Sequence, residues 1–312
     1  MANPFLSCLG LPDDARVMIP HVDDVGMLRN SIDAFAEAVE FGTATCGSAI
    51  VPSPWLPALA ERVADHPEWD LGLHLALNCE FGTYKWRPIS TMDPATGLVD
   101  EHGYMTSNKL DTVARATPQD VHAEVLAQIA LARRLGIEPT HVDTHSMVLW
   151  DARFVADYAG LYDEVGVVPA LGKADVAAMT ATIESMPPGK DRDDFSKMLA
   201  DFQASASLAD DFEARGIPVA DNMSMTPLTG YFGREERLDA ARRAIDGLPE
   251  GTITVYVFHA LKPGTETDGL QRFTEGRIGD YELLMNERFK SYLEGSGVTL
   301  LGWRDLVQAM PR

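Results

Sequence analysis

Two adjacent carboxylates follow an apolar stretch near the start of the chain. Asp23 and Asp24 lie in the sequence IPHVDDVGM, residues 19–27, and Gly26 follows two positions later. Successive residues of a strand face opposite sides, so both carboxylates can reach one site only where the strand ends and the backbone turns. Gly26 is typical of such a turn. The pair therefore predicts a site at which two carboxylates converge.

Histidines occur at strand spacing in two further segments. In HVDTH, residues 141–145, His141, Asp143 and His145 alternate, and an extended backbone would point all three side chains the same way, about 6.5 to 7 Å apart. In LGLHLALN, residues 71–78, His74 lies opposite the leucine face. A lone histidine on a strand is usually structural, and a surface edge strand would also accommodate HVDTH. The apolar flanks favour an interior strand, where such groups must pair, bind a metal or face water.

The residue types indicate metal-assisted hydrolysis. Two imidazoles and one carboxylate, with an open position for water, are a usual ligand set for catalytic zinc or a related transition metal. Magnesium would prefer more oxygen ligands. One of the two aspartates would bind the metal, and the other would remain to take a proton from the bound water. His259, after the apolar segment VYVF, could protonate a leaving group or stabilise an oxyanion.

These residues need a scaffold that brings distant strand ends together. Short apolar segments alternate with amphipathic ones, which predicts a parallel sheet covered by helices, either doubly wound or closed as an irregular, TIM-like (β/α) barrel; the number of strands favours the barrel. In both folds the active site lies at the carboxyl ends of the strands. Strands are expected at residues 16–24, 70–78, 140–148, 166–172, 216–222, 251–260 and 297–303, and helices at 30–41, 117–136, 234–245 and 281–293.

One segment interrupts the alternation. Residues 173–215 are helical and polar in character, and we expect them to form an insertion. The sequence contains neither a low-complexity linker nor an internal repeat. A single domain over residues 1–312 that carries this insertion is therefore the simplest organisation.

Composition narrows the class of partner. The chain has 26 Lys and Arg residues against 47 Asp and Glu, a formal charge of −21, which opposes binding to nucleic acid or to an anionic membrane. The hydrophobic content of 46% supports a substantial core. The three cysteines form no CxxC pair, and the start of the sequence lacks a basic signal-peptide region. We expect a cytoplasmic protein with a small neutral substrate, and a homodimer is left open.

The motifs together resemble the YdjC-like (ChbG-type) carbohydrate deacetylases. VDDVG at 22–26 is similar to the family's ADDFG, GLHLAL at 72–77 to its GxHxxL, and THVDTH at 140–145 to its THxDxH. His259 resembles the family's histidine after a late strand, and the segment from Arg277 to GVTLLGWRDL resembles its C-terminal pattern. These anchors run through nearly the whole chain in the family's order.

This resemblance implies a deformed TIM-like barrel and the divalent-metal-dependent removal of an acetyl group from an N-acetylated sugar or oligosaccharide. By motif position, Asp24, His74 and His145 would be the metal ligands, Asp23 the general base and His259 the general acid. The ligand types favour zinc, with magnesium, cobalt and nickel as alternatives.

Five further residues are assigned to the substrate. Tyr84, Trp86 and Arg87 in TYKWRP are predicted sugar contacts because aromatic faces suit sugar C–H surfaces; a local packing role is the alternative. Asp143 and Arg277 complete the set, and Arg277 could instead orient an active-site carboxylate or form a surface salt bridge. Two other functions remain open: a metal-dependent amide or ester hydrolase with a non-sugar substrate, and a non-catalytic, metal-containing sugar-binding protein.

Overall fold

Parallel strands form a curled sheet at the centre of the computed structural model, which describes residues 2–173, 184, 190–229, 233–267, 270 and 273–311. The strand order is β5–β4–β3–β2–β1–β7–β6, with β8 paired to β1. The strands are β1 (Arg16–Val25), β2 (Cys46–Ile50), β3 (Asp70–Leu75), β4 (His141–Thr144), β5 (Val168–Pro169), β6 (Asn222–Met225), β7 (Thr252–Phe258) and β8 (Thr299–Leu300). Every pairing between these strands is parallel.

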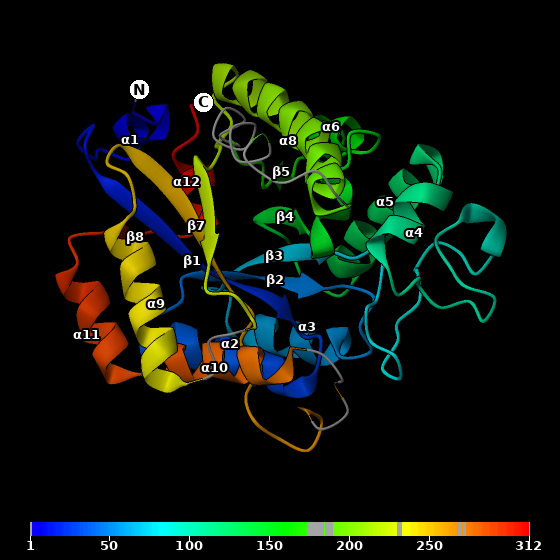
Figure 1. The fold of residues 1–312 in the computed structure, drawn as a ribbon, viewed down its shortest axis with the longest axis horizontal. Helices are drawn as coiled ribbons and strands as arrows, with labels where there is room; N and C mark the ends of the chain where they lie inside the picture. Colours follow the sequence, from blue (N-terminus) through cyan, green and yellow to red (C-terminus); the bar gives the residue numbers. More distant parts are fainter. Residues whose placement is uncertain are drawn as a thin grey trace.

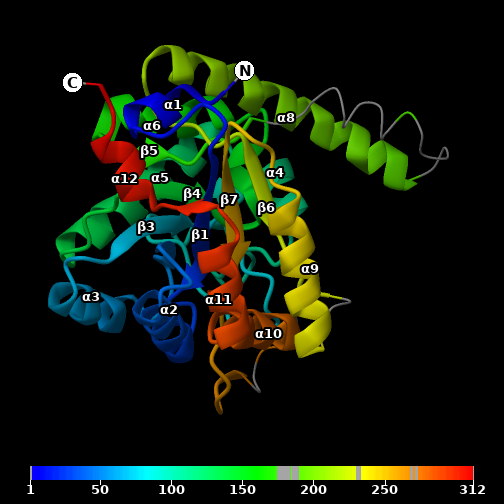
Figure 2. The same ribbon diagram turned by 90° about the vertical axis from the view of Figure 1, so that its left-hand side faces the viewer.

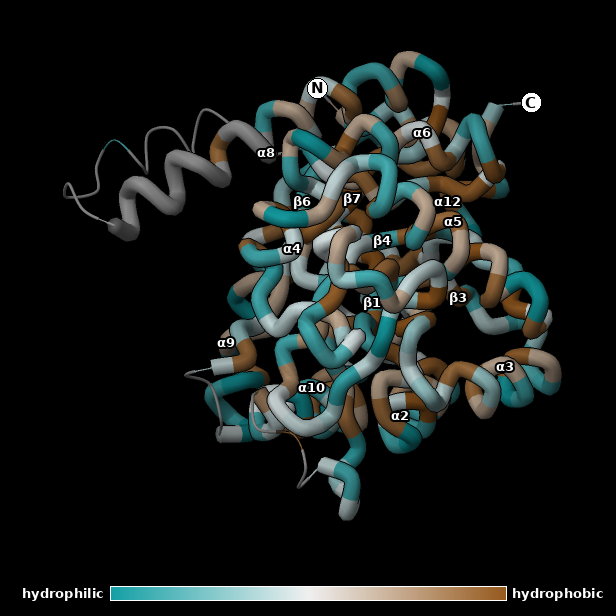
Figure 3. The backbone as a smooth tube through the Cα atoms, turned by 90° about the vertical axis from the view of Figure 1, so that its right-hand side faces the viewer, coloured by the Kyte–Doolittle hydropathy of each residue, from teal (hydrophilic) through white to brown (hydrophobic). Residues whose placement is uncertain are grey.

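Helices surround the sheet. In Figures 1 and 2, α2 lies next to α10 and has α3 on its other side, while α9 and α11 cover the side of β7 and β6. The strands are mostly hydrophobic, whereas hydrophilic residues lie on the outward sides of the helices (Figure 3). The helices are α1 (Pro4–Cys8), α2 (Arg29–Phe41), α3 (Leu56–Asp65), α4 (Lys109–Arg115), α5 (Pro118–Arg134), α6 (Val155–Val165), α8 (Lys190–Ala214), α9 (Arg234–Asp246), α10 (Thr274–Leu284), α11 (Glu287–Gly295) and α12 (Trp303–Gln308), with 3₁₀ turns η1 (Pro94–Thr96) and η2 (His145–Trp150).

A short contact brings the two edges of the sheet together. Gly172, just after β5, forms a parallel bridge with Ala220, just before β6. Lys173 N–H donates to Ala220 O at 2.9 Å, and Ala220 N–H donates to Leu171 O at 3.2 Å. The predicted α/β fold, a deformed TIM-like barrel, is therefore confirmed.

Local sequence signals set the ends of two helices as predicted. Thr117 caps α5 by accepting from Asp120 N–H, and Pro118 opens the helix. Gly42 ends α2 with φ +86°, in the left-handed region that glycine adopts without strain. In the part of the chain that the structure describes, no helix has the length and apolar character needed to cross a membrane.

Several expected boundaries were wrong. The strand expected at 216–222 begins only at Asn222, because Pro218 lacks an N–H and Ala220 instead bridges to Gly172. The helix expected at 281–293 is two helices, since the Asn286 side chain accepts from Arg288 N–H and caps a new helix, α11. Strand β2 and helix α3 were not predicted.

The expected insertion is described only in part. Helix α8 lies inside the range 173–215 and packs against α6. Residues 174–183 and 185–189 lie outside the described residues.

Candidate active site at the carboxyl ends of the strands

A bulge in β1 turns Asp23 and Asp24 toward the same cavity. His21 and Val22 pair with Cys46 and Gly47, but Val25 pairs with Ala49, so β1 contains one extra residue. Asp24 takes up this residue with φ +60°. Both carboxylates line the cavity. The turn expected at Gly26 does follow the end of β1 at Val25, but the bulge before it, which was not predicted, is what brings the two carboxylates to one cavity.

Three side chains place potential ligand atoms around one point. Asp24 Oδ1 lies 3.5 Å from His74 Nε2 and 3.2 Å from His145 Nδ1. Tetrahedral ligands with bonds of about 2.1 Å would lie about 3.4 Å apart. Asp24 Oδ1 is buried and accepts no hydrogen bond from the described residues. This donor set fits a divalent transition-metal ion.

Each candidate imidazole ligand is fixed through its other ring nitrogen. His74 Nδ1 lies 2.7 Å from Asp143 Oδ1, while Ser48 Oγ donates to Asp143 Oδ2 at 2.8 Å. His145 Nε2 lies 2.8 Å from Glu80 Oε2. A carboxylate behind a histidine ligand fixes its tautomer and ring orientation.

Arg277 fixes Asp24, the candidate carboxylate ligand, in a similar way. Its Nη1 donates to Asp24 Oδ2, and its Nη2 lies 3.8 Å from Glu80 Oε1. Arg277 and Asp24 are both buried, so their charges compensate each other away from water. The arrangement leaves Asp24 Oδ1 directed toward the two imidazoles.

The surrounding charges favour a cation at this point. Burial alone would lower the pKa of His74, but the charges of Asp143 and Asp23 outweigh it and raise the pKa to about 9. Glu80 and Asp24 similarly outweigh burial and raise the pKa of His145 to about 10. Burial opposes ionisation of Glu80, but His145 lowers the pKa of this carboxyl to about 2. A divalent ion would replace the protons of the two imidazoles.

Asp23 and His259 lie beside the three candidate ligands. Asp23 Oδ2 is 3.8 Å from His259 Nε2 and 4.0 Å from His74 Nε2. The His259 backbone N–H donates to Asp280 Oδ2 at 2.8 Å. Burial is the main cause that lowers the pKa of His259 to about 4; Arg277 adds to it and Asp23 opposes it. The imidazole of His259 is therefore neutral near pH 7.

The polar groups form one wall of a cavity of about 310 Å³. Another wall is apolar and includes Met147, Met223, Met225 and Leu228. The three methionines are 37%, 51% and 42% exposed, respectively. The cavity thus combines a wall of carboxylates and imidazoles with an apolar wall rich in methionine.

The structure does not place three of the predicted sugar-binding residues on the wall of the cavity. Tyr84 donates through its hydroxyl to Met27 O, and Trp86 Nε1 donates to Asn78 O at 3.1 Å. Arg87 lies over the ring of Tyr104, 4.5 Å from its centroid. None of the three is among the described residues that line the cavity. Their contact with a sugar stays a prediction.

The other two predicted substrate-binding residues line the cavity, but the segment HVDTH differs from its expected structure. Asp143 and Arg277 line the cavity, yet both carboxylate oxygens of Asp143 and Nη1 of Arg277 already bind protein groups. The expectation that HVDTH is one extended strand was wrong, because β4 ends at Thr144 and His145 opens η2. His141 lies beneath the site, with its Nε2 2.9 Å from His21 Nε2.

Two residues that matter to the geometry had no assigned role. Glu80 lies in the loop after β3, six positions beyond His74, and His21 precedes the aspartate pair on β1. Glu80 is the first acidic residue of the loop that follows the carboxyl end of β3, and this loop position would have drawn attention to it. The inward-facing alternation of β1 would have drawn attention to His21.

The fold and these side chains define an α/β barrel with a candidate divalent-metal site at the carboxyl ends of its strands. The chain matches the YdjC-like protein family over residues 17–295 and belongs to it, which confirms the resemblance. A carbohydrate deacetylase from Geobacillus stearothermophilus is 28% identical over 133 residues, covering 43% of this chain and 50% of the relative. One from Thermoanaerobacter pseudethanolicus is 24% identical over 130 residues, covering 42% and 50%.

The matched region spans about half the length of these curated relatives. A solved structure from Enterococcus faecalis V583, described provisionally as a cellobiose-phosphate cleavage protein, has a TM-score of 0.68 at 19% identity. That match covers 94% of this chain and 99% of the solved chain, and it supports the fold.

Proposed function

We propose that this protein is a metal-dependent carbohydrate deacetylase that removes the acetyl group from an N-acetylated sugar or oligosaccharide. The observation that carries the proposal is that the two adjacent carboxylates have different neighbours at the site. Asp24 Oδ1 lies 3.2 Å from His145 Nδ1, whereas Asp23 Oδ2 lies 3.8 Å from His259 Nε2. Relatives named carbohydrate deacetylases support the substrate class.

Asp24, His74 and His145 would hold the metal ion. Zinc suits two imidazoles and a carboxylate, with cobalt, nickel and magnesium as alternatives. A bound divalent ion supplies Lewis-acid polarisation of the amide carbonyl and a lowered pKa for water. Glu80, Asp143 and Arg277 orient the three ligands through their other atoms.

Asp23 would act as the general base. Its Oδ2 borders the cavity between His74 and His259, where it can take a proton from the attacking water. The oxygen of that water bonds to the carbonyl carbon, and the C–N bond then breaks. The products are acetate and the free amino sugar.

His259 would act as the general acid toward the leaving nitrogen. Because burial lowers its pKa to about 4, His259 starts neutral and must receive a proton before it can donate one. Asp23 Oδ2, 3.8 Å from His259 Nε2, holds the proton taken from water and is a nearby source. One proton thus passes from water through Asp23 and His259 to the amine.

A screen for acetate release tests this function. We expect acetate release from N-acetylated mono- or oligosaccharides, and loss of this activity when a chelator is added. Simple acetyl esters and non-sugar amides, tested separately, represent the alternative substrate classes. Asp23→Asn should lower kcat by about 10²- to 10⁴-fold because it removes the base, with metal affinity retained. Asp239→Asn, on an exposed position of α9, is the matched control. Undiminished activity of the Asp23 variant would overturn the assignment of the base.

A further inference from the structure

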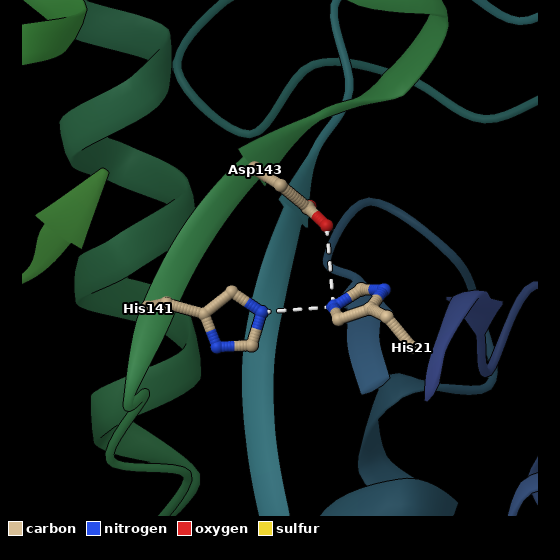
Figure 4. Close-up of side chains that lie close together, drawn as sticks. All are labelled: His21, His141 and Asp143. Carbon is tan, nitrogen blue, oxygen red and sulfur yellow. Dashed lines mark hydrogen bonds and ion pairs between the residues drawn. The ribbon is translucent and has the colours of Figure 1, made fainter. Parts of the chain in front are cut away.

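A histidine pair lies directly behind the proposed base. His21 Nδ1 is 2.8 Å from Asp23 Oδ1, and His21 Nε2 is 2.9 Å from His141 Nε2. Figure 4 shows the two rings meeting edge to edge, with Asp143 Oδ2 3.5 Å from His21 Nε2. Both histidines are fully buried, at 1% and 0% exposure. Neither has a part in the proposed reaction so far.

The His141 ring has little freedom to move. It stacks on Trp303, with centroids 5.2 Å apart and an interplanar angle of 22°. On another side it lies against Gly72, where an added Cβ would come within 2.5 Å of the ring. His141 Nδ1 lies 3.0 Å from Thr140 Oγ1. The ring therefore forms a fixed support for His21.

The hydrogen bonds determine where the protons lie. Thr140 Oγ1 donates to Asp70 Oδ1 at 2.5 Å, so it must accept from His141 Nδ1–H. His141 Nε2 then carries a lone pair and accepts from His21 Nε2–H. His21 Nδ1 makes no aligned hydrogen bond with the described residues, but it lies 2.8 Å from Asp23 Oδ1, an ion-pair distance that requires a proton on this nitrogen. This assigns an imidazolium to His21 and a neutral ring to His141.

The charges around the pair agree with that assignment. Burial opposes protonation of His21, but the close contact with Asp23 and the charge of this carboxylate outweigh it and raise the pKa; Asp143 adds to the effect and His74 opposes it. For His141, burial and the neighbouring His21 lower the pKa well below its ordinary value.

We infer that His21 is a positioning residue for Asp23, supported from below by His141. His21 holds Oδ1 of the carboxylate, so that Oδ2 faces the cavity between His74 and His259. Among the described residues, His21 has the nearest partner atom to Asp23, since the contacts of Oδ2 are 3.8 Å and 4.0 Å long. The inference rests on the proposed function, because the role of base belongs to it.

The same cluster does not have the geometry of a second metal site. His21, His141 and Asp143 have ligand-type atoms within 4.8 Å of one another. However, the two Nε2 atoms are 2.9 Å apart, a hydrogen-bond length shorter than the roughly 3.4 Å expected for two ligands of one tetrahedral ion. Asp143 is also engaged by His74 and Ser48.

Two substitutions separate positioning from general structural support. The amide nitrogen of His21→Asn can occupy the place of Nδ1 and still donate to Asp23, whereas that of His21→Gln can occupy the place of Nε2 and reaches only His141. We expect His21→Asn to keep kcat within about tenfold, and His21→Gln to lower kcat by about 100-fold with little change in KM. His122→Gln, on the surface beside Glu164, is the matched control.

Crystal structures of both variants give a readout that does not depend on activity. Asp23 should keep its orientation in His21→Asn and turn in His21→Gln. If His21→Gln does not fold, nitrogen-15 NMR of the metal-loaded wild type still tests the arrangement: two protonated ring nitrogens are expected for His21 and one for His141. A neutral His21 with an unprotonated Nδ1 would overturn the inference.

The outcomes distinguish this inference from the proposed function. Equal kcat values for the two variants, or an unmoved Asp23 in both crystal structures, would overturn the positioning role. Absence of acetate release by the wild type across the whole screen would overturn the function, while the crystal structures would still decide what holds Asp23.

Discussion

Asp24 shows how one residue in an unfavourable conformation can organise a site. A positive φ costs a non-glycine residue about 1 to 2 kcal/mol, although aspartate tolerates it better than most. Here it absorbs the extra residue of the β1 bulge and brings two neighbouring carboxylates to one cavity. The buried contact with Arg277 then fixes Asp24 in place. The sequence predicted convergence of the pair, but a bulge depends on the register with β2.

Glu80 provides a prediction for metal affinity. Its Oε2 lies 2.8 Å from His145 Nε2, so Glu80→Gln would remove the charge that fixes the orientation of this proposed ligand. We expect zinc affinity to fall by about 10- to 100-fold without loss of the fold. Competition with a chromogenic chelator measures the affinity, and Glu101→Gln, at an exposed loop position, is the control. An unchanged affinity for the Glu80 variant would show that His145 is held by other contacts.

Strand periodicity explains which site residues could be found from the sequence. Alternation on β3 separates His74 from the leucine face, and the prediction that His74 lies inside the barrel follows from that pattern. The same rule failed at His145, because β4 ends one residue earlier, at Thr144. Glu80 lies in a loop, where no period exists. Pairing between strands that are far apart in the sequence determines which strand ends meet. The sequence of a single strand does not predict this pairing.

The contact between β3 and β4 gives a prediction at the scale of the element. A Cβ on Gly72 would come within 2.5 Å of the His141 ring, which Trp303 prevents from moving away. Gly72→Ala should therefore destabilise the protein by about 1 to 3 kcal/mol. Gly160→Ala, inside α6 with open space around the position, should stabilise it by up to about 1 kcal/mol. Urea unfolding measures both, and equal stabilities would contradict the close packing at Gly72.

Across the whole molecule, the alternation of strands and helices was sufficient to predict the barrel but not how it closes. β5 has two residues, and the only described bridge between the sheet edges is that of Gly172 with Ala220. The local sequence does not predict this bridge, because its two residues are 48 positions apart. In addition, Pro218 lies close to the start of β6 and makes that start hard to recognise. Side chains must therefore contribute to closure.

Asp221 is the side chain best placed to do so. Its Oδ2 accepts from Asn3 Nδ2 and from Ile253 N–H, each at 2.8 Å, and its Oδ1 lies 3.3 Å from Lys173 Nζ. The carboxylate thus joins the segment before α1, the start of β7 and the segment after β5. Asn3 is itself buried, at 2% exposure, so its end of the junction is shielded from water.

Asp221→Asn should weaken the closure of the barrel. All three partners donate, so an amide cannot satisfy them all and must turn its NH₂ group toward one of them, which we expect to cost about 1 to 3 kcal/mol in the free energy of unfolding. Urea denaturation near pH 7 measures the change, and Asp239→Asn on the exposed side of α9 should stay within about 0.5 kcal/mol of the wild type. If Asp221→Asn matches that control, the backbone pair of Gly172 and Ala220 is sufficient to hold the two edges of the sheet together.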